Sequence, residues 1–394
     1  YIHIPFCRSR CTYCTFNTYT GLSGLFDSYV DALCKEIAWL GARYARSEVH
    51  TIYFGGGTPS VLPIYHVDKI ITSVHKHFVV TADVEISFEA NPEPEFVDKR
   101  YLAGLLQAGI TRLSFGAQSA LPADLRLFNR RHLWSDVIEV VESARAVGIY
   151  NVSLDLIYGA PGQSIAGWHD TLAQALALNP THLSLYSLGL EQGAPLTRWV
   201  DTGRVEALED DLVATMYDYA SDVLEQHGLL QYEISNWAYA GNECQHNLQY
   251  WRRQPYIGSG AGAHSFIDPI RYMVVKDPQE YIQRWQRGMS DNDGNLSISD
   301  ELWPYLPPVV DPPSIEVLSE DEACAETMFL GLRLLQEGVS MKAFQARFGQ
   351  SIDEIYSDEL RLLVNKGQII KTNNRIILPK NMRLIANQAF ESFV

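Results

Sequence analysis

Three of the six cysteines in this chain lie close together near its start, in the pattern Cys7-x-x-x-Cys11-x-x-Cys14. A short loop of this kind can bring three thiolates to one face of a metal cluster. An electron-transfer [4Fe–4S] centre normally has four cysteine ligands, so three close cysteines leave one iron with an open coordination site. The alternatives are a zinc site and a chance grouping of cysteines, but a structural zinc normally takes four ligands at paired spacings. We therefore predict a [4Fe–4S] cluster with an iron that is open to a substrate or cofactor.

The segments that must position these cysteines alternate between two patterns. Short β-branched and aromatic runs are separated by stretches with apolar residues three and four positions apart, which is typical of helices that cover a sheet. This alternation predicts an α/β fold with six parallel strands in a partial or full (βα)6 barrel. The expected strands are residues 1–4, 51–54, 84–89, 112–116, 152–157 and 182–188, and the expected helices include 26–46, 134–147 and 166–177.

Unusual residues stand at the ends of the expected strands. Functional groups of such a fold collect at the carboxyl ends of the strands. Cys7, the glycines of 55–57, Glu89, Gln118 and Asp155 all follow or end a strand-like run. The site is therefore expected to be assembled from many loops.

The pattern changes after about residue 230, and prolines crowd residues 302–314. We expect a barrel domain over residues 1–300 with additional elements after about 230, a proline-rich linker over 301–315 and a C-terminal domain over 316–394.

The C-terminal domain is expected to resemble a winged helix, because helical patterns are followed by a hairpin pattern. It is no more basic than its surroundings, so we expect it to cover the barrel mouth or bind a partner protein rather than DNA. The expected helices are residues 320–337, 340–348 and 352–366, and the expected hairpin strands are 368–372 and 375–378.

Composition narrows the classes of function. The formal net charge is -16, and no cluster of Lys or Arg could hold a phosphate backbone, so nucleic acid is not an expected partner. No apolar stretch approaches the roughly 20 residues that span a bilayer. We expect a cytoplasmic protein, and the sequence leaves peripheral membrane contact and oligomerisation open. Cys34, Cys244 and Cys324 are isolated, and we assign them no chemistry.

The cysteine motif resembles that of the radical S-adenosylmethionine (SAM) superfamily, in which an aromatic residue precedes the third cysteine, as Tyr13 does here. The resemblance implies that the open iron chelates SAM and that an electron from the cluster cleaves the sulfonium to give a 5'-deoxyadenosyl radical. It also implies a low-potential electron donor as a partner. The protein's own part would be to orient SAM and exclude water.

Four further motifs resemble the group around oxygen-independent coproporphyrinogen III oxidase: Tyr-Ile-His-Ile-Pro-Phe-Cys, Gly-Gly-Gly-Thr-Pro-Ser, Leu-Ser-Phe-Gly-Ala-Gln-Ser and Asp-Leu-Ile-Tyr-Gly. Carried over residue by residue, the resemblance implies that Tyr1, Gly56 and Glu89 contact the cluster-bound SAM. It further implies that a second SAM or its surroundings are contacted by Tyr13, Gly57, Thr58, Gln118, Arg130 and Asp155.

One position departs from the oxidase, whose motif continues to a further cysteine two residues after the third, where this chain has Phe16. In lacking this cysteine, the chain resembles the HemW-type haem chaperones. The motif His246-Asn-x-x-Tyr250-Trp251 resembles a motif of the same group. The resemblance implies a protein that binds haem as cargo and delivers it to haem-accepting proteins. His246 is then the first candidate axial ligand of haem iron, while a histidine hydrogen-bonded to backbone is the alternative. The resemblance extends to Gly258-Ser-Gly-Ala-Gly-Ala-His264-Ser265, where His264 is a second candidate and tight backbone passage without a ligand role is the alternative.

Two classes of function therefore remain open at this point. One is the haem chaperone. The other is an enzyme, either a coproporphyrinogen oxidase or a related radical SAM methylase or cyclopropanase, with Phe16 counting against the oxidase. Reductive SAM cleavage fits both classes, and we assign no catalytic residue.

Overall fold

The computed structural model describes residues 1–44, 47–287 and 306–394. Its central sheet confirms the expected α/β fold, because the first six strands in spatial order are parallel neighbours, and β10 and β9 extend the sheet antiparallel. No ladder between described residues joins β9 back to β1, so the barrel is partial. The strands are, in spatial order, β1 (Ile2–Ile4), β4 (Glu48–Gly56), β5 (Val79–Ala90), β6 (Arg112–Gln118), β7 (Val152–Tyr158), β8 (His182–Ser187), β10 (Asn236–Ala238) and β9 (Leu230–Glu233).

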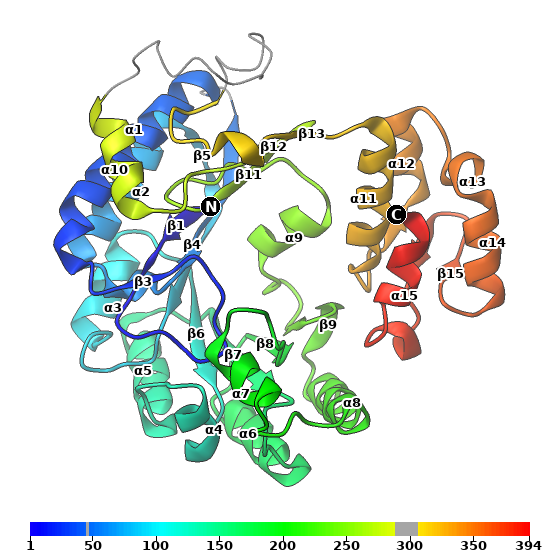
Figure 1. The fold of residues 1–394 in the computed structure, drawn as a ribbon, viewed down its shortest axis with the longest axis horizontal. Coiled ribbons are helices and arrows are strands. Elements are labelled where there is room, and N and C mark those ends of the chain that lie inside the picture. The colour runs from blue at the N-terminus through cyan, green and yellow to red at the C-terminus, as the bar shows by residue number, and fades with distance from the viewer. Residues whose placement is uncertain (45–46, 288–305) are drawn as a thin grey trace.

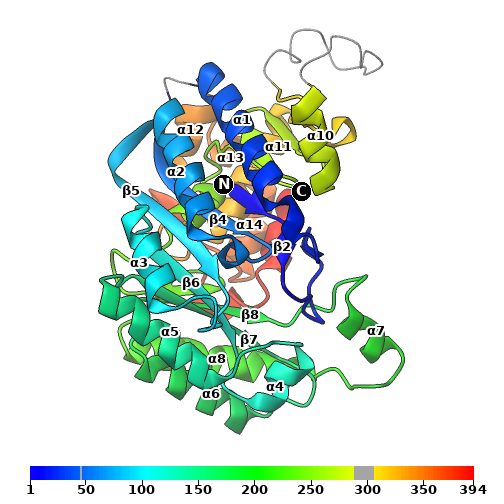
Figure 2. The same cartoon turned by 90° about the vertical axis from the view of Figure 1, so that its left-hand side faces the viewer.

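Helices cover the outer face of this sheet, as Figures 1 and 2 show, while α7 (Pro195–Asp201) projects from it. Helix α5 shows why they do so: Val137, Val140, Val141 and Ala144 are fully buried at helical spacing. The covering helices are α1 (Phe26–Tyr44), α2 (Ile64–His77), α3 (Lys99–Gln107), α4 (Pro122–Leu127), α5 (Trp134–Val147), α6 (Ile165–Ala177), α8 (Asp210–Gln226) and α10 (Pro278–Arg287).

A second, smaller antiparallel sheet lies near β1, the edge strand of the barrel. It consists of β11 (His264–Ile267), β12 (Ile270–Met273) and β13 (Glu316–Val317). The described part of the expected linker packs against it, with Leu306, Val309 and Val310 buried. Residues 301–305 of that linker lie outside the described residues. The domain boundaries expected from the sequence stay a prediction.

The C-terminal part forms a separate lobe with its own core (Figure 1). Its main elements run helix, strand, three helices, two strands and a last helix, and the last two strands pair as expected of a winged helix. The helix expected over 352–366 is divided at Tyr356. The elements are α11 (Glu320–Leu332), β14 (Val339–Ser340), α12 (Met341–Phe348), α13 (Ile352–Ile355), α14 (Ser357–Asn365), β15 (Ile370–Lys371), β16 (Arg375–Ile377) and α15 (Asn387–Phe390).

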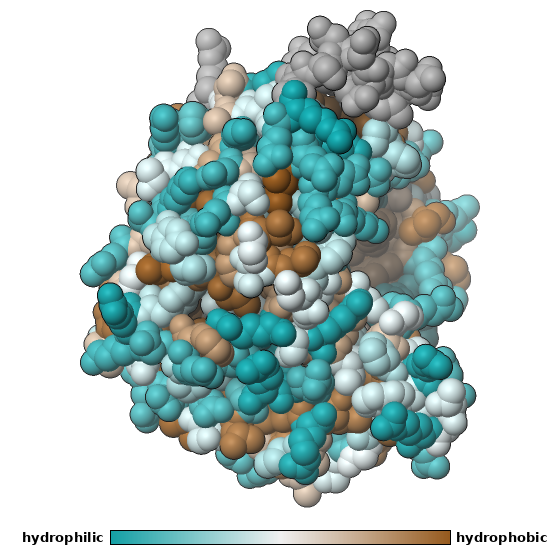
Figure 3. Space-filling model, turned by 60° about the vertical axis from the view of Figure 1, so that its left-hand side comes forward, coloured by the Kyte–Doolittle hydropathy of each residue, from teal (hydrophilic) through white to brown (hydrophobic). Residues whose placement is uncertain are grey.

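The outside of the barrel is largely hydrophilic. On the face drawn in Figure 3, apolar side chains gather in small areas between hydrophilic ones. Among the described residues, no helix is both long and apolar enough to cross a membrane.

Candidate cluster and cofactor site

The cysteine loop is held at both ends by a short strand pair. Cys7 ends β2 (Phe6–Cys7), which pairs in parallel with β3 (Tyr19–Thr20). In the middle, Thr12 fastens the loop to the end of α4, since its backbone N–H donates to the carbonyl of Phe128 at 3.2 Å and its hydroxyl donates to the carbonyl of Leu127 at 2.7 Å. The loop is therefore fixed against the barrel mouth.

The three cysteines are partly exposed and form no disulfide bond, and all three line the same cavity. Burial raises the pKa of Cys7 and of Cys14, so both thiols are protonated until a metal draws them into the thiolate form. No set of three or more His, Cys, Asp or Glu side chains among the described residues converges on a single metal ion. Each thiolate of a [4Fe–4S] centre binds a different iron, so three thiols that line one cavity fit such a cluster.

The cavity beside the cysteines has a volume of about 540 Å³, within the range of small-molecule sites. It brings together eight of the nine residues expected to bind SAM, from six different strands and loops. These eight residues, which line the cavity with Cys7, Cys11 and Cys14, are Tyr13, Gly56, Gly57, Thr58, Glu89, Gln118, Arg130 and Asp155.

The glycines at the end of β4 are required by close packing. Gly56 has a φ of +112°, and a Cβ there would lie 2.5 Å from the His3 ring. A Cβ on Gly57 would lie 2.7 Å from the carbonyl oxygen of Phe6. The backbone N–H groups of Gly57 and Thr58 donate to the carbonyls of Ile4 and Phe6, so these two donors already have partners inside the protein.

Two carboxyl groups line the cavity, Glu89 near the end of β5 and Asp155 in the middle of β7, and β6 lies between these two strands. Glu89 accepts from the hydroxyl of Tyr53 at 2.7 Å, and burial raises the pKa of Glu89 to about 7. Asp155 accepts from the hydroxyl of Ser114 at 3.0 and 3.2 Å, and burial raises its pKa as well. Carboxylates suit the hydroxyls and the positive charge of SAM, so this lining fits the cofactor.

Arg130 and Gln118 line the same cavity as the carboxyl groups and the cysteines. Arg130 donates from Nη2 to Asn91 Oδ1 and to the Gly116 carbonyl, both at 2.7 Å, and from Nη1 to Cys11 Sγ at 3.4 Å. Its buried Nε has no partner among the described residues. Gln118 has a φ of +65° at a register shift of β6, a strained conformation of a kind that clusters at functional sites.

Tyr1, the ninth expected SAM residue, lies outside this cavity and lines the neighbouring one. Its hydroxyl contacts His3 Nδ1 at 3.1 Å, and its ring stacks on Tyr53 with 6.2 Å between ring centroids. The two cavities share Gly56 and Glu89, so Tyr1 lies next to the expected SAM position rather than within it.

His246 lies in neither cavity but in the first turn of α9 (Gln245–Trp251), where it is buried. Its ring stacks on Tyr53 at 5.1 Å between centroids. Nδ1 is 2.8 Å from the hydroxyl of Thr51, and Nε2 is 2.9 Å from the hydroxyl of Tyr250. Both ring nitrogens are therefore hydrogen-bonded, and ligation of haem iron by His246 would require one of these bonds to break.

Three residues that position the site have no counterpart in the sequence prediction. Tyr53 holds Glu89, Ser114 holds Asp155, and Asn91 holds Arg130. Asn91 could have been found, because it stands two residues after Glu89 in the same strand-end motif.

Comparison with known proteins agrees with this fold. Residues 1–175 match the model of the radical SAM superfamily, and residues 318–384 match the HemN C-terminal domain. The structure of coproporphyrinogen III oxidase (HemN) from Escherichia coli superposes with a TM-score of 0.82 at 21% identity, over 100% of this chain and 88% of that one. At this identity the likeness shows a shared fold.

Curated relatives are closer in sequence. The chain is 35% identical to the heme chaperone HemW of Bacillus subtilis over 395 residues, which cover 100% of this chain and 98% of that protein. It is 41% identical to the heme chaperone HemW of Synechocystis over 289 residues, 72% of this chain and 69% of the relative.

The fold and the cysteine-lined cavity define a radical SAM protein, a class that implies a [4Fe–4S] cluster and SAM. Within this class, the chain belongs to the HemW family of heme chaperones.

Proposed function

We propose that this protein binds haem and delivers it to haem-accepting proteins, and that its barrel holds a [4Fe–4S] cluster and SAM beside the haem. The observation that carries this proposal is the likeness to a heme chaperone over the whole length of both chains. Cys7, Cys11 and Cys14 would hold the cluster, and the residues that line the 540 Å³ cavity would hold SAM. When bound, the cluster would supply the electron for reductive cleavage of SAM.

Phe16 supports the chaperone over a coproporphyrinogen oxidase. It stands where the oxidase motif has a further cysteine, and it is 68% exposed at the shared edge of the two cavities. An exposed aromatic ring at a cavity edge can pack against a flat apolar cargo, whereas it cannot replace a thiol in redox chemistry.

The protein's own groups would orient SAM. Glu89 and Asp155 would accept hydrogen bonds from SAM, and Arg130 would hold the loop of Cys11 through the sulfur. The covering helices and the cysteine loop would limit the access of water. A low-potential electron donor is part of this proposal.

Haem delivery can be tested with the anaerobically reconstituted full chain. The protein is loaded with haem and mixed with an apo-form of a haem protein from the same source, and haem arrival is followed by the acceptor's Soret band. Excess apomyoglobin measures passive haem release under the same conditions.

Transfer to the acceptor faster than passive release would support delivery through a complex of the two proteins. Transfer at the passive rate for every acceptor tried would contradict delivery, while leaving haem binding as a separate result.

A further inference from the structure

A second, larger cavity lies beside the cluster cavity, with a volume of about 980 Å³. Its walls come from the N-terminal segment, the end of α9, the β11–β12 hairpin and α11 of the C-terminal lobe. Arg10, Phe16, Gly56 and Glu89 line both cavities, so the two spaces meet at the cysteine loop. A ligand here would lie next to the expected cluster and SAM, in a space large enough for a macrocycle.

One face of the β11–β12 hairpin supplies much of the wall. Alternate residues of a strand point to the same side of a sheet, and residues paired across strands share that side. His264 pairs with Met273, and Phe266 pairs with Arg271. All four line the cavity, which therefore receives an imidazole, a thioether, an aromatic ring and a guanidinium from one small surface.

The His264 ring is available to a ligand. It is exposed, and no hydrogen bond joins it to another described residue. Partial desolvation by the cavity wall, together with the charges of Lys276 and Arg271, holds the pKa of His264 below its ordinary value, so the ring is neutral at neutral pH. Neutral imidazole is the form that binds iron.

The other histidine of this cavity is not available. His3 contacts the hydroxyl of Tyr1 and the carbonyl of Asn17, both at 3.1 Å. His246, outside the cavity, is also bonded at both nitrogens. Of these three histidines, His264 alone offers a ring nitrogen without breaking a hydrogen bond.

The charges of the cavity favour a ligand with carboxylates. Glu326 is already paired with Arg253 at 2.9 Å and with Arg271 at 2.7 Å. Lys276 and Arg10 have no carboxylate partner among the described residues. Two unpaired cations in a cavity of an otherwise acidic chain can bind two acidic groups.

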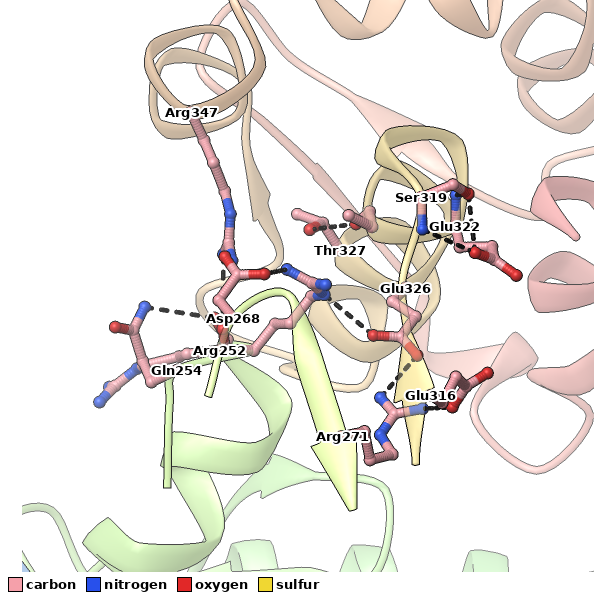
Figure 4. A network of polar contacts seen from close by, with 12 residues as sticks. Arg252, Gln254, Asp268, Arg271, Glu316, Ser319, Glu322, Glu326, Thr327 and Arg347 are labelled. Carbon is pink, nitrogen blue, oxygen red and sulfur yellow. Dashed lines mark hydrogen bonds and ion pairs between the residues drawn. The ribbon is translucent and has the colours of Figure 1, made fainter. Parts of the chain in front are cut away.

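The polar network in Figure 4 fixes this wall. Glu326 on α11 joins Arg253 and Arg271, and Asp268 in the β11–β12 turn joins Arg253 to Arg347 of α12. Leu330, one turn after Glu326, adds an apolar contact to the cavity. The C-terminal lobe therefore completes the cavity.

We propose that this cavity binds haem, with His264 as the iron ligand, Phe266 and the neighbouring aromatic rings against the macrocycle, and Lys276 and Arg10 toward the two propionates. This inference rests on the proposed function and deepens it by placing the cargo. It differs from the sequence prediction, in which His246 is the first candidate ligand.

The test is an anaerobic haem titration of the full chain, followed through the Soret band. His264→Ala is compared with His246→Ala, and with His227→Ala, which removes an exposed histidine after α8. We expect His264→Ala to weaken haem binding by about tenfold or more and to shift the Soret band. Free imidazole should restore the wild-type Soret position in this variant only.

A second pair of variants tests the propionate contacts without touching the iron. Lys276→Gln should weaken haem binding, while Lys342→Gln, an exposed lysine on α12, should leave it unchanged. Circular dichroism and SAM binding verify that each variant is folded.

The outcomes separate this inference from the proposed function. If the wild type binds haem saturably and His264→Ala binds it equally well, haem is not held by His264, and the proposed function still stands. The same conclusion follows if haem binding is lost in His246→Ala and kept in His264→Ala. Absence of saturable haem binding by the wild-type protein overturns both.

Discussion

The guanidinium of Arg130 donates a hydrogen bond to the sulfur of Cys11, with 3.4 Å between Nη1 and Sγ. The same guanidinium is held by Asn91 and by the Gly116 carbonyl at 2.7 Å each, so its position is fixed by the barrel rather than by the cysteine loop. A partly buried cation therefore lies against one of the expected cluster ligands.

Replacing Arg130 by Gln should lower the reduction potential of the cluster. A nearby cation and a hydrogen bond to a ligand sulfur both favour the reduced, more negative form. We expect the potential to fall by roughly 60 mV, which is a tenfold change in the equilibrium constant for reduction by one electron. A redox titration followed by electron paramagnetic resonance measures this potential. The exposed Arg126→Gln is the matched control, and an equal potential in both variants would contradict the role of Arg130.

Replacing Cys11 by Ser should abolish cluster assembly, because the remaining two thiols cannot hold the cluster firmly. Iron and sulfide content and the visible absorbance of the reconstituted protein measure this loss. Cys34→Ser, which removes a half-buried thiol on α1 away from the cavity, should keep the full iron content. Full iron content in Cys11→Ser would reject the ligand assignment.

SAM affinity should depend on pH through Glu89. Its folded-state pKa is raised to about 7 by burial, so the carboxyl is mainly protonated below that pH and mainly ionised above it. The ionised form is the stronger acceptor for a cationic ligand. Calorimetry should show tighter SAM binding at pH 8 than at pH 6, and Glu89→Gln should bind about tenfold more weakly at pH 8 with this pH dependence removed. The same pH dependence in Glu89→Gln would assign it to another group.

Stability should depend on pH through Glu36, a fully buried carboxyl on α1. It accepts from the hydroxyl of Tyr281 at 2.6 Å and from the N–H of Gly260 at 2.8 Å, and burial raises its pKa to about 7. A raised carboxyl pKa means that the folded state binds more protons, so stability falls as pH rises from the unfolded pKa of 4.5 to about 7. Between pH 4 and pH 8, the free energy of unfolding of Glu36→Gln should therefore increase relative to that of wild type by about 3 kcal/mol. Denaturant unfolding of both proteins at each pH measures this. A difference in the free energy of unfolding between wild type and Glu36→Gln that does not change with pH would contradict the prediction.

Docking of the C-terminal lobe should depend on Glu326. Glu326→Ala removes the nearer of the two carboxylate partners of Arg253, a guanidinium that is 2% exposed, and leaves only Asp268 at 3.5 Å. Complete loss of a buried pair costs about 3–5 kcal/mol, so we expect a cost of up to about that size. Calorimetric unfolding should show a lower transition temperature, whereas the exposed Glu320→Ala should change it little. An unchanged transition in Glu326→Ala would show that the ion pair does not stabilise the interface.

The alternating pattern predicted the fold well because its causes are local. All six expected parallel strands form, and the helix expected over 134–147 has those bounds, since apolar spacing and Gly148 after its end determine it. The antiparallel β9 and β10 were not predicted, because they are short and their pairing to β8 is a long-range contact.

The site could be predicted in part for the same reason. Strand ends of a parallel sheet meet at one edge, so Glu89, Gln118 and Asp155 line one cavity with the cysteines. The surroundings of His246 could not be predicted, because they depend on a long-range contact. Glu85 of β5 accepts from the first N–H groups of α9 and so fixes the start of this helix. The contribution of His264 to a cavity depends on the register of β11 with β12, and the sequence pattern does not specify that register.

The most direct test of the central claim is to supply haem to one sample of the anaerobically reconstituted protein and coproporphyrinogen III, SAM and a reductant to another. The account predicts a Soret band that saturates at a single haem site in the first sample and no protoporphyrinogen in the second. Protoporphyrinogen formation in the second sample, or haem absorbance that never saturates in the first, would contradict it.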